Sequence, residues 1–115
     1  MSVSGAWVLH YSWGCSLSYP SVDIRFNNNG TFTGGGDGLW HEQDGTLLLI
    51  WKTGPAKYGG NVTGNAGSGA MSTFNAPNSA GNGCWYLTRE GVGLEKEERE
   101  RARAAATHDV AGNAL

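Results

Sequence analysis

Apolar residues recur at every second position in several short segments of the first 90 residues. The apolar positions of the clearest segments are Trp7, Leu9, Tyr11 and Trp13, then Val22, Ile24 and Phe26, and later Leu47, Leu49 and Trp51. Between Val22 and Phe26 the alternate positions carry Asp23 and Arg25. Successive side chains of a β-strand point to opposite faces, so the pattern predicts strands with one apolar face.

Clusters rich in Gly, Asn, Asp and Pro interrupt this alternation at short intervals and indicate turns. They are NNNG at 27–30, GGGDG at 34–38, QDG at 43–45, TGP at 53–55, GNAGSG at 64–69 and NAPNSAGNG at 75–83. The predicted strands between them span 5–13, 21–26, 30–34, 38–42, 46–52, 57–64, 68–74 and 83–89. Turns this short make neighbouring strands antiparallel, because a parallel crossover needs about a dozen residues or more.

A meander of about eight strands with one apolar face can close by pairing its first strand with its last. Closure removes both exposed edges and encloses a lumen wide enough for side chains or one small ligand. The predicted fold class is therefore all-β, a small antiparallel up-and-down β-barrel.

One cysteine directly follows the predicted first strand and the other lies on the predicted last strand, and each is close to a tryptophan. Cys15 follows Trp13 and Gly14, and Cys84 directly precedes Trp85. If these strands are neighbours, the cysteines can meet, and we predict a Cys15–Cys84 disulfide across the seam of the barrel. The alternative is two buried free thiols, since no leader directs the chain to an oxidising compartment.

Composition and charge narrow the classes of protein and partner. A chain of 115 residues with 19 glycines and five tryptophans suits one small all-β domain. A formal net charge of -2 gives no basic cluster for nucleic acid or an anionic membrane, and no apolar run is long enough to span a bilayer. The opening MSVSGAWVLHY lacks the pattern of a signal peptide, which leaves the localisation unknown, although a cysteine pair and a low-charge body would suit a secreted protein.

Charge divides the chain into a barrel domain at 1–92 and a charged C-terminal tail at 93–115. The stretch EKEERERAR at 95–103 contains Glu95–Arg99 and Glu97–Arg101 pairs, whose spacing supports a helix. No apolar stripe accompanies these pairs, so we predict a solvated helix whose removal changes stability little. The alternative is a docking helix for a partner.

Three short motifs resemble those of avidin-like proteins, within the wider lipocalin-like or calycin barrels. Gly5-Ala6-Trp7 is similar to the glycine-x-tryptophan opening of that family, LLLIWKT at 47–53 to its tryptophan-lysine strand, and CWYLTREG at 84–91 to its tryptophan-leucine closing strand. The resemblance covers residues 5–90. It implies that Trp51 and Trp85 line a ligand pocket, as the matching tryptophans line the biotin pocket of the family.

The polar biotin contacts of that family are missing from this sequence. Leu9, Tyr11 and Trp13 stand where the family's asparagine and serine would fall, and the stretch before Tyr58 lacks its serine and threonine. The charged tail replaces the strand that carries its aspartate. We therefore expect the barrel without biotin binding.

Candidate catalytic and metal-binding residues are few. The histidines His10, His41 and His108 have no partner at metal-ligand spacing, so we predict neither a metal nor a cofactor. His41 and Glu42 in WHEQDG point to opposite faces of a strand and form no acid–base pair. No nucleophile motif is present, and we predict no catalytic residue.

Aromatic residues are the most distinctive feature, and the predicted ligand-binding set consists of Tyr11, Trp13, Trp40, Trp51, Tyr58 and Trp85. Large side chains can simply fill a small barrel, or some of them can line a pocket for an apolar or aromatic small molecule. The preferred function is a protein that binds such a molecule in the lumen or mouth of the barrel and does not bind biotin. The alternatives are a cyclase or isomerase acting on a hydrophobic substrate and a protein-interaction module using its loops, and the sequence leaves an oligomer open.

Overall fold

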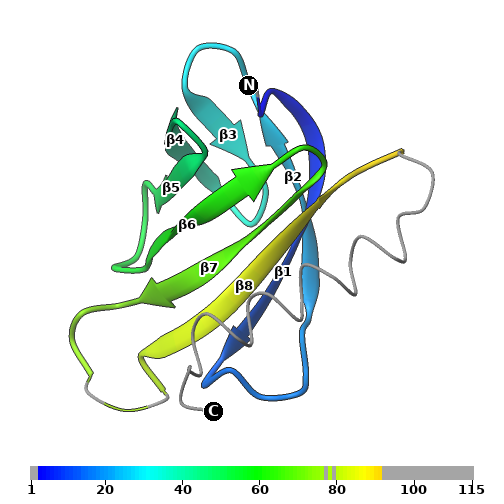
Figure 1. The fold of residues 1–115 in the computed structure, drawn as a ribbon. Helices are drawn as coiled ribbons and strands as arrows, with labels where there is room; N and C mark the ends of the chain where they lie inside the picture. The colour runs from blue at the N-terminus through cyan, green and yellow to red at the C-terminus, as the bar shows by residue number, and fades with distance from the viewer. Residues whose placement is uncertain (1–2, 77, 79, 92–115) are drawn as a thin grey trace.

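The barrel closes through antiparallel pairing of every strand with its neighbour and of β1 with β8 (Figure 1). The computed structural model describes residues 3–76, 78 and 80–91. Its strands are β1 (Gly5–Trp13), β2 (Ser21–Phe26), β3 (Thr31–Thr33), β4 (Asp37–Gln43), β5 (Thr46–Trp51), β6 (Lys57–Thr63), β7 (Ala66–Ser72) and β8 (Asn82–Arg89). The predicted all-β barrel of eight strands is confirmed. The predicted tail, 93–115, lies outside the described residues.

The turn between β6 and β7 is shorter than the sequence predicts. GNAGSG at 64–69 was expected to be a turn, but only Gly64 and Asn65 separate the two strands, and β7 already begins at Ala66. The later glycines serve close packing instead: a Cβ at Gly69 would collide with the carbonyl of Gly59, and one at Gly67 would lie 2.9 Å from the carbonyl oxygen of Asn61. Glycine in a strand permits this close backbone approach.

The core of the barrel is formed by the inward faces that the alternation of apolar residues predicts. Residues Trp7, Leu9, Ile24, Phe26, Leu47 and Leu49 are all buried and belong to one hydrophobic cluster. Asp23 and Arg25, between the apolar positions of β2, are exposed. The interior is therefore a packed core rather than an empty channel.

One end of the barrel is closed by the segment that precedes β1. Trp7 is fully buried, and its Nε1 donates a hydrogen bond of 2.8 Å to the carbonyl of Val3. The guanidinium of Arg89 lies 4.3 Å from the centre of the Trp7 ring and donates to the carbonyl of Ser4. The opposite end, which we call the open end, carries the connections 14–20, 34–36, 52–56 and 73–81.

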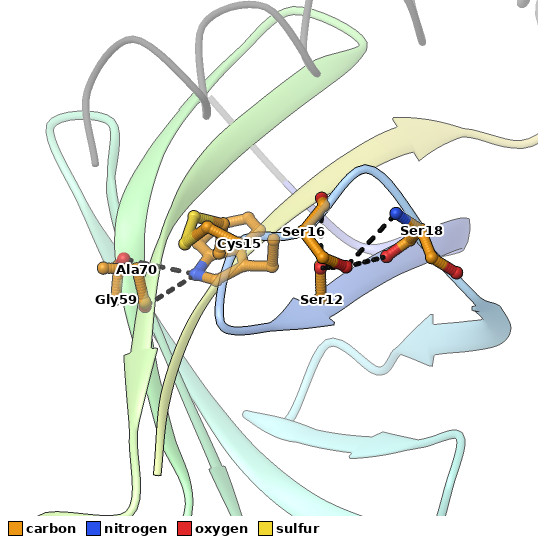
Figure 2. Close-up of a disulfide and its surroundings, with 8 residues drawn as sticks. Ser12, Cys15, Ser16, Ser18, Gly59 and Ala70 are labelled. Atoms are coloured by element: carbon orange, nitrogen blue, oxygen red, sulfur yellow. Dashed lines mark hydrogen bonds between the residues drawn. A yellow bond between two sulfur atoms is a disulfide. The ribbon is translucent and has the colours of Figure 1, made fainter. Parts of the chain in front are cut away.

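The predicted disulfide joins the seam of the barrel. Cys15 and Cys84 are bonded, with their Cα atoms 5.1 Å apart, so the alternative of two free thiols does not hold. Figure 2 shows the serine network beside it, in which Ser12 and Ser16 share a hydrogen bond of 3.1 Å and Ser18 donates its N–H to the Ser16 hydroxyl. This network shapes the turn after β1 that carries Cys15.

Candidate binding site

Four of the six predicted ligand-binding residues lie side by side inside the barrel. The ring of Tyr58 on β6 is 4.6 Å from that of Trp51 on β5 and 6.4 Å from that of Trp85 on β8. Tyr11 on β1 is paired directly with Trp85. Trp13, two residues further along β1, is half-buried against the same core.

We call Tyr11, Trp51, Tyr58 and Trp85 the aromatic row. Trp40 lies apart from it. Its ring packs on Phe26 at 5.9 Å, and its Nε1 donates a hydrogen bond of 2.9 Å to the carbonyl of Asn27. Asn27 begins the turn between β2 and β3, at the closed end of the barrel. The structure therefore does not bring Trp40 together with Trp51 and Trp85, although all three face inward.

The indole N–H groups of the row are bonded to backbone carbonyls. Trp51 Nε1 donates to the carbonyl of Gly34 at 3.1 Å. Trp85 Nε1 donates to the carbonyls of Ala70 at 2.9 Å and Gly59 at 3.3 Å, both of which are labelled in Figure 2. A buried N–H needs such a partner. Trp85 is fully buried, whereas Trp51 is half-buried, so a ligand can reach Trp51 more readily.

An open groove of about 530 Å³ adjoins the row along β5, β6 and β7. Its wall contains Leu48, Gly59 and Ala70, which are paired in register across the three strands. These residues face outward, because Leu48 is exposed while its neighbours Leu47 and Leu49 are buried. The small Gly59 and Ala70 leave room above the sheet that larger side chains would fill.

The groove also meets the interior of the barrel. Tyr58 and Met71 are core residues, yet both line it. Phe74 forms part of its rim, is 78% exposed and has a positive φ of 60°, which is uncommon for a bulky residue. Of the predicted ligand-binding residues, Tyr58 therefore contributes directly to the groove, and the others of the row lie behind it.

The sequence does not predict the groove, because the apolar wall of the groove lies on outward faces of the strands, whereas the predicted aromatic set lies on inward faces. The available signal was on the outward faces, where apolar Leu48 and Ile50 on β5 stand near the small Gly59 and Ala70. Alternation identifies such outward apolar positions, but their grouping depends on the register of three strands.

Few polar groups face the groove. Among its described lining residues Lys57 alone carries a charge, and its Nζ donates to the carbonyl of Pro55 at 3.3 Å. Ser72 and Asn82 bond to each other at 2.7 Å. The walls of the site are thus mostly apolar. Its polar groups include one cation and one amide–hydroxyl pair.

The WHEQDG cluster lies away from the groove and forms a turn. His41 is exposed, and Glu42 accepts a hydrogen bond of 2.8 Å from the N–H of Gly45. Asp44 and Gly45 both have positive φ, as a tight hairpin turn requires. Among the described residues, no three His, Cys, Asp or Glu side chains gather where they could hold a metal ion.

Tyr58 should make stability depend on alkaline pH. Burial, with a smaller contribution from Tyr11, raises the pKa of Tyr58 from 10.0 to about 12. Because the unfolded phenol loses its proton first, the stabilisation from this group is complete below pH 10 and is lost as the pH rises toward 12. We expect the free energy of unfolding, measured by urea denaturation, to fall more steeply across this range in the natural protein than in Tyr58→Phe. Equal slopes in the two proteins would contradict the burial of the phenol.

Two comparisons with known proteins found no match. No protein-family model matches it, and no curated protein matches it. In the part of the chain that the structure describes, no helix is long and apolar enough to cross a membrane.

Proposed function

We propose that this protein is a binding barrel for an apolar or aromatic small molecule, held in the groove beside Tyr58. The observation that carries the proposal is the groove itself. Its volume of about 530 Å³ falls within the range of about 300–1,000 Å³ that is typical of small-molecule sites. Apolar walls with a few polar groups are also typical of such sites.

The aromatic row behind the groove supports this assignment and offers a way to detect a ligand. Tyr58 contacts both the groove and Trp51, so a molecule bound against Tyr58 lies close to two tryptophans. A flat ligand there can stack on Tyr58 and change the intrinsic fluorescence. Trp51 and Trp85, which resemble pocket residues of avidin-like barrels, lie behind this groove and do not line it.

Binding has better support than catalysis. A cyclase or isomerase of this size needs a polar group aimed at its substrate, and the described lining of the groove contains no histidine or carboxylate. Burial raises the pKa of Tyr58 from 10.0 to about 12, so its phenol is even less able than an ordinary tyrosine to act as a base near neutral pH. A mostly apolar ligand, bound without chemical change, fits these side chains best.

A protein-interaction role for the loops has one observation in its favour. Leu17, in the connection after β1, is 88% exposed, and Phe74 in the connection after β7 is exposed as well. Both connections lie at the open end of the barrel. Exposed apolar side chains at loop tips are suited to contact a protein partner.

A titration with naphthalene and indole derivatives, followed by tryptophan fluorescence, tests the proposal. Ala70→Phe fills the groove from an exposed outward position and should weaken binding at least tenfold while leaving the melting temperature within a few degrees. Thr63→Phe is the matched control, because Thr63 is also outward and exposed but does not line the groove.

Three results would count against the groove. Equal loss of affinity in both variants would mean that the ligand does not occupy it, and unchanged affinity in Ala70→Phe would place binding elsewhere. An absence of saturable quenching across the panel would remove the small-molecule proposal and leave the loops as the better candidate.

A further inference from the structure

The outer face of the barrel over β1, β7 and β8 is buried where the outside of a barrel should meet solvent. His10 and Tyr86 are neighbours across β1 and β8 and point outward, but they are only 9% and 7% exposed. By contrast, the outward residues Leu39 on β4 and Leu48 on β5 are 51% and 44% exposed. The seam between the first and last strands is therefore covered, whereas the opposite wall is open.

The covered surface, which we call the seam face, consists of Val8, His10, Ser68, Tyr86 and Thr88. All five belong to two adjoining rows of the sheet and all are buried. Its centre is aromatic: the rings of His10 and Tyr86 stack with centroids 4.2 Å apart.

Described residues account for part of this cover. Tyr19, from the connection after β1, packs on Tyr86 with ring centroids 5.3 Å apart. Thr88 is further along β8 and fully buried, and its Oγ1 has no hydrogen-bond partner within the part of the chain that is described. Because Thr88 points outward and yet has no exposed surface, this end of the face is covered as well.

We propose that the seam face is the docking site of the chain's own C-terminal segment, residues 93–115. The position where the chain leaves the barrel favours this occupant. β8 ends at Arg89, next to Thr88, and 23 residues remain after Val92. A segment that begins beside the seam face meets it at a high effective concentration, which a separate partner does not.

The length of residues 95–115 and the size of their side chains also suit docking on the seam face. As a helix, residues 95–115 would extend about 30 Å, close to the roughly 26 Å of an eight-residue strand. In a helix Ala102, Ala106 and Val110 share one side, while Ala104 and Thr107 lie on the other. Small side chains allow close approach to the stacked rings of the seam face, and the charges of 95–103 can remain in water.

Charge alone predicts a solvated tail, whereas the covered seam face favours a docked one. A solvated tail would leave the barrel unchanged when it is altered, because exposed ion pairs contribute little to stability. A docked tail protects Tyr86 and the seam from solvent. The two outcomes can be separated in the full-length protein.

A pair of double variants provides the test. Ala102→Glu with Ala106→Glu places two carboxylates on the docking side, and the matched control, Ala104→Glu with Thr107→Glu, adds the same charge on the other side. Nitration of Tyr86 by tetranitromethane, followed by peptide mass spectrometry, should rise at least fivefold in the first variant and remain near the natural level in the control. The melting temperature should fall in the first variant only.

Nuclear Overhauser effects in the natural full-length chain give an independent measurement. We expect contacts from the His10 and Tyr86 rings to methyl groups of residues 93–115, unchanged on dilution. Contacts found only between isotopically different molecules would make a second copy the occupant and overturn the proposal. Equal nitration of Tyr86 in both double variants, or the absence of these contacts, would overturn it as well.

Discussion

Replacing both Cys15 and Cys84 with alanine is expected to lower the free energy of unfolding by about 4 kcal/mol. The bond links residues 69 positions apart in sequence, so it removes much of the freedom of the unfolded chain. It also joins the first and last strands, whose pairing closes the barrel. Urea denaturation of the natural and double-alanine proteins measures the difference, and mass spectrometry without reductant should find the two cysteines linked.

Ser16→Ala is the matched control for the disulfide. It removes hydrogen bonds from the turn that carries Cys15 but leaves the covalent link in place. We expect Ser16→Ala to lower the free energy of unfolding by about 1 kcal/mol or less, because the hydrogen bonds of this hydroxyl are exposed or only partly buried. Complete labelling of both thiols in freshly purified native protein, or equal stability of the natural and double-alanine proteins, would contradict the prediction.

Trp85→Ala is expected to destabilise the barrel by about 3–5 kcal/mol, the usual cost of truncating a buried aromatic residue. Trp85 is fully buried, and its indole binds carbonyls on both β6 and β7. The substitution removes a core ring and leaves those carbonyls without this donor. Thermal and urea unfolding measure the loss.

Two further substitutions separate the contribution of the Trp85 ring from that of its N–H group and compare Trp85 with a less buried tryptophan. Trp85→Phe keeps a ring and removes the N–H, so it should cost about 1–3 kcal/mol. Trp13→Ala, at a half-buried position, should cost less than Trp85→Ala because less apolar surface leaves the core. If Trp85→Ala were no more harmful than Trp13→Ala, Trp85 would not be a central core residue.

Period-two alternation allowed the strands and their inward faces to be predicted. Trp7 and Leu9 alternate with residues that point outward, and only one of these faces could form a core. Short turns then made neighbouring strands antiparallel, and pairing of the two ends placed Cys15 near Cys84. These features can be predicted from the local sequence pattern, because the direction of each side chain in a strand and the length of each turn depend on only a few neighbouring residues.

The groove and the seam face were decided only by the tertiary structure. Leu48, Gly59 and Ala70 come from three strands, and their alignment depends on registers that no short segment specifies. Trp40 and Trp51 are both predicted to face inward. In the structure Trp40 lies toward the closed end of the barrel, whereas Trp51 belongs to the aromatic row. The burial of Tyr86 likewise depends on what lies over the sheet, because alternation distinguishes the two faces of a strand but does not reveal what covers its outer one.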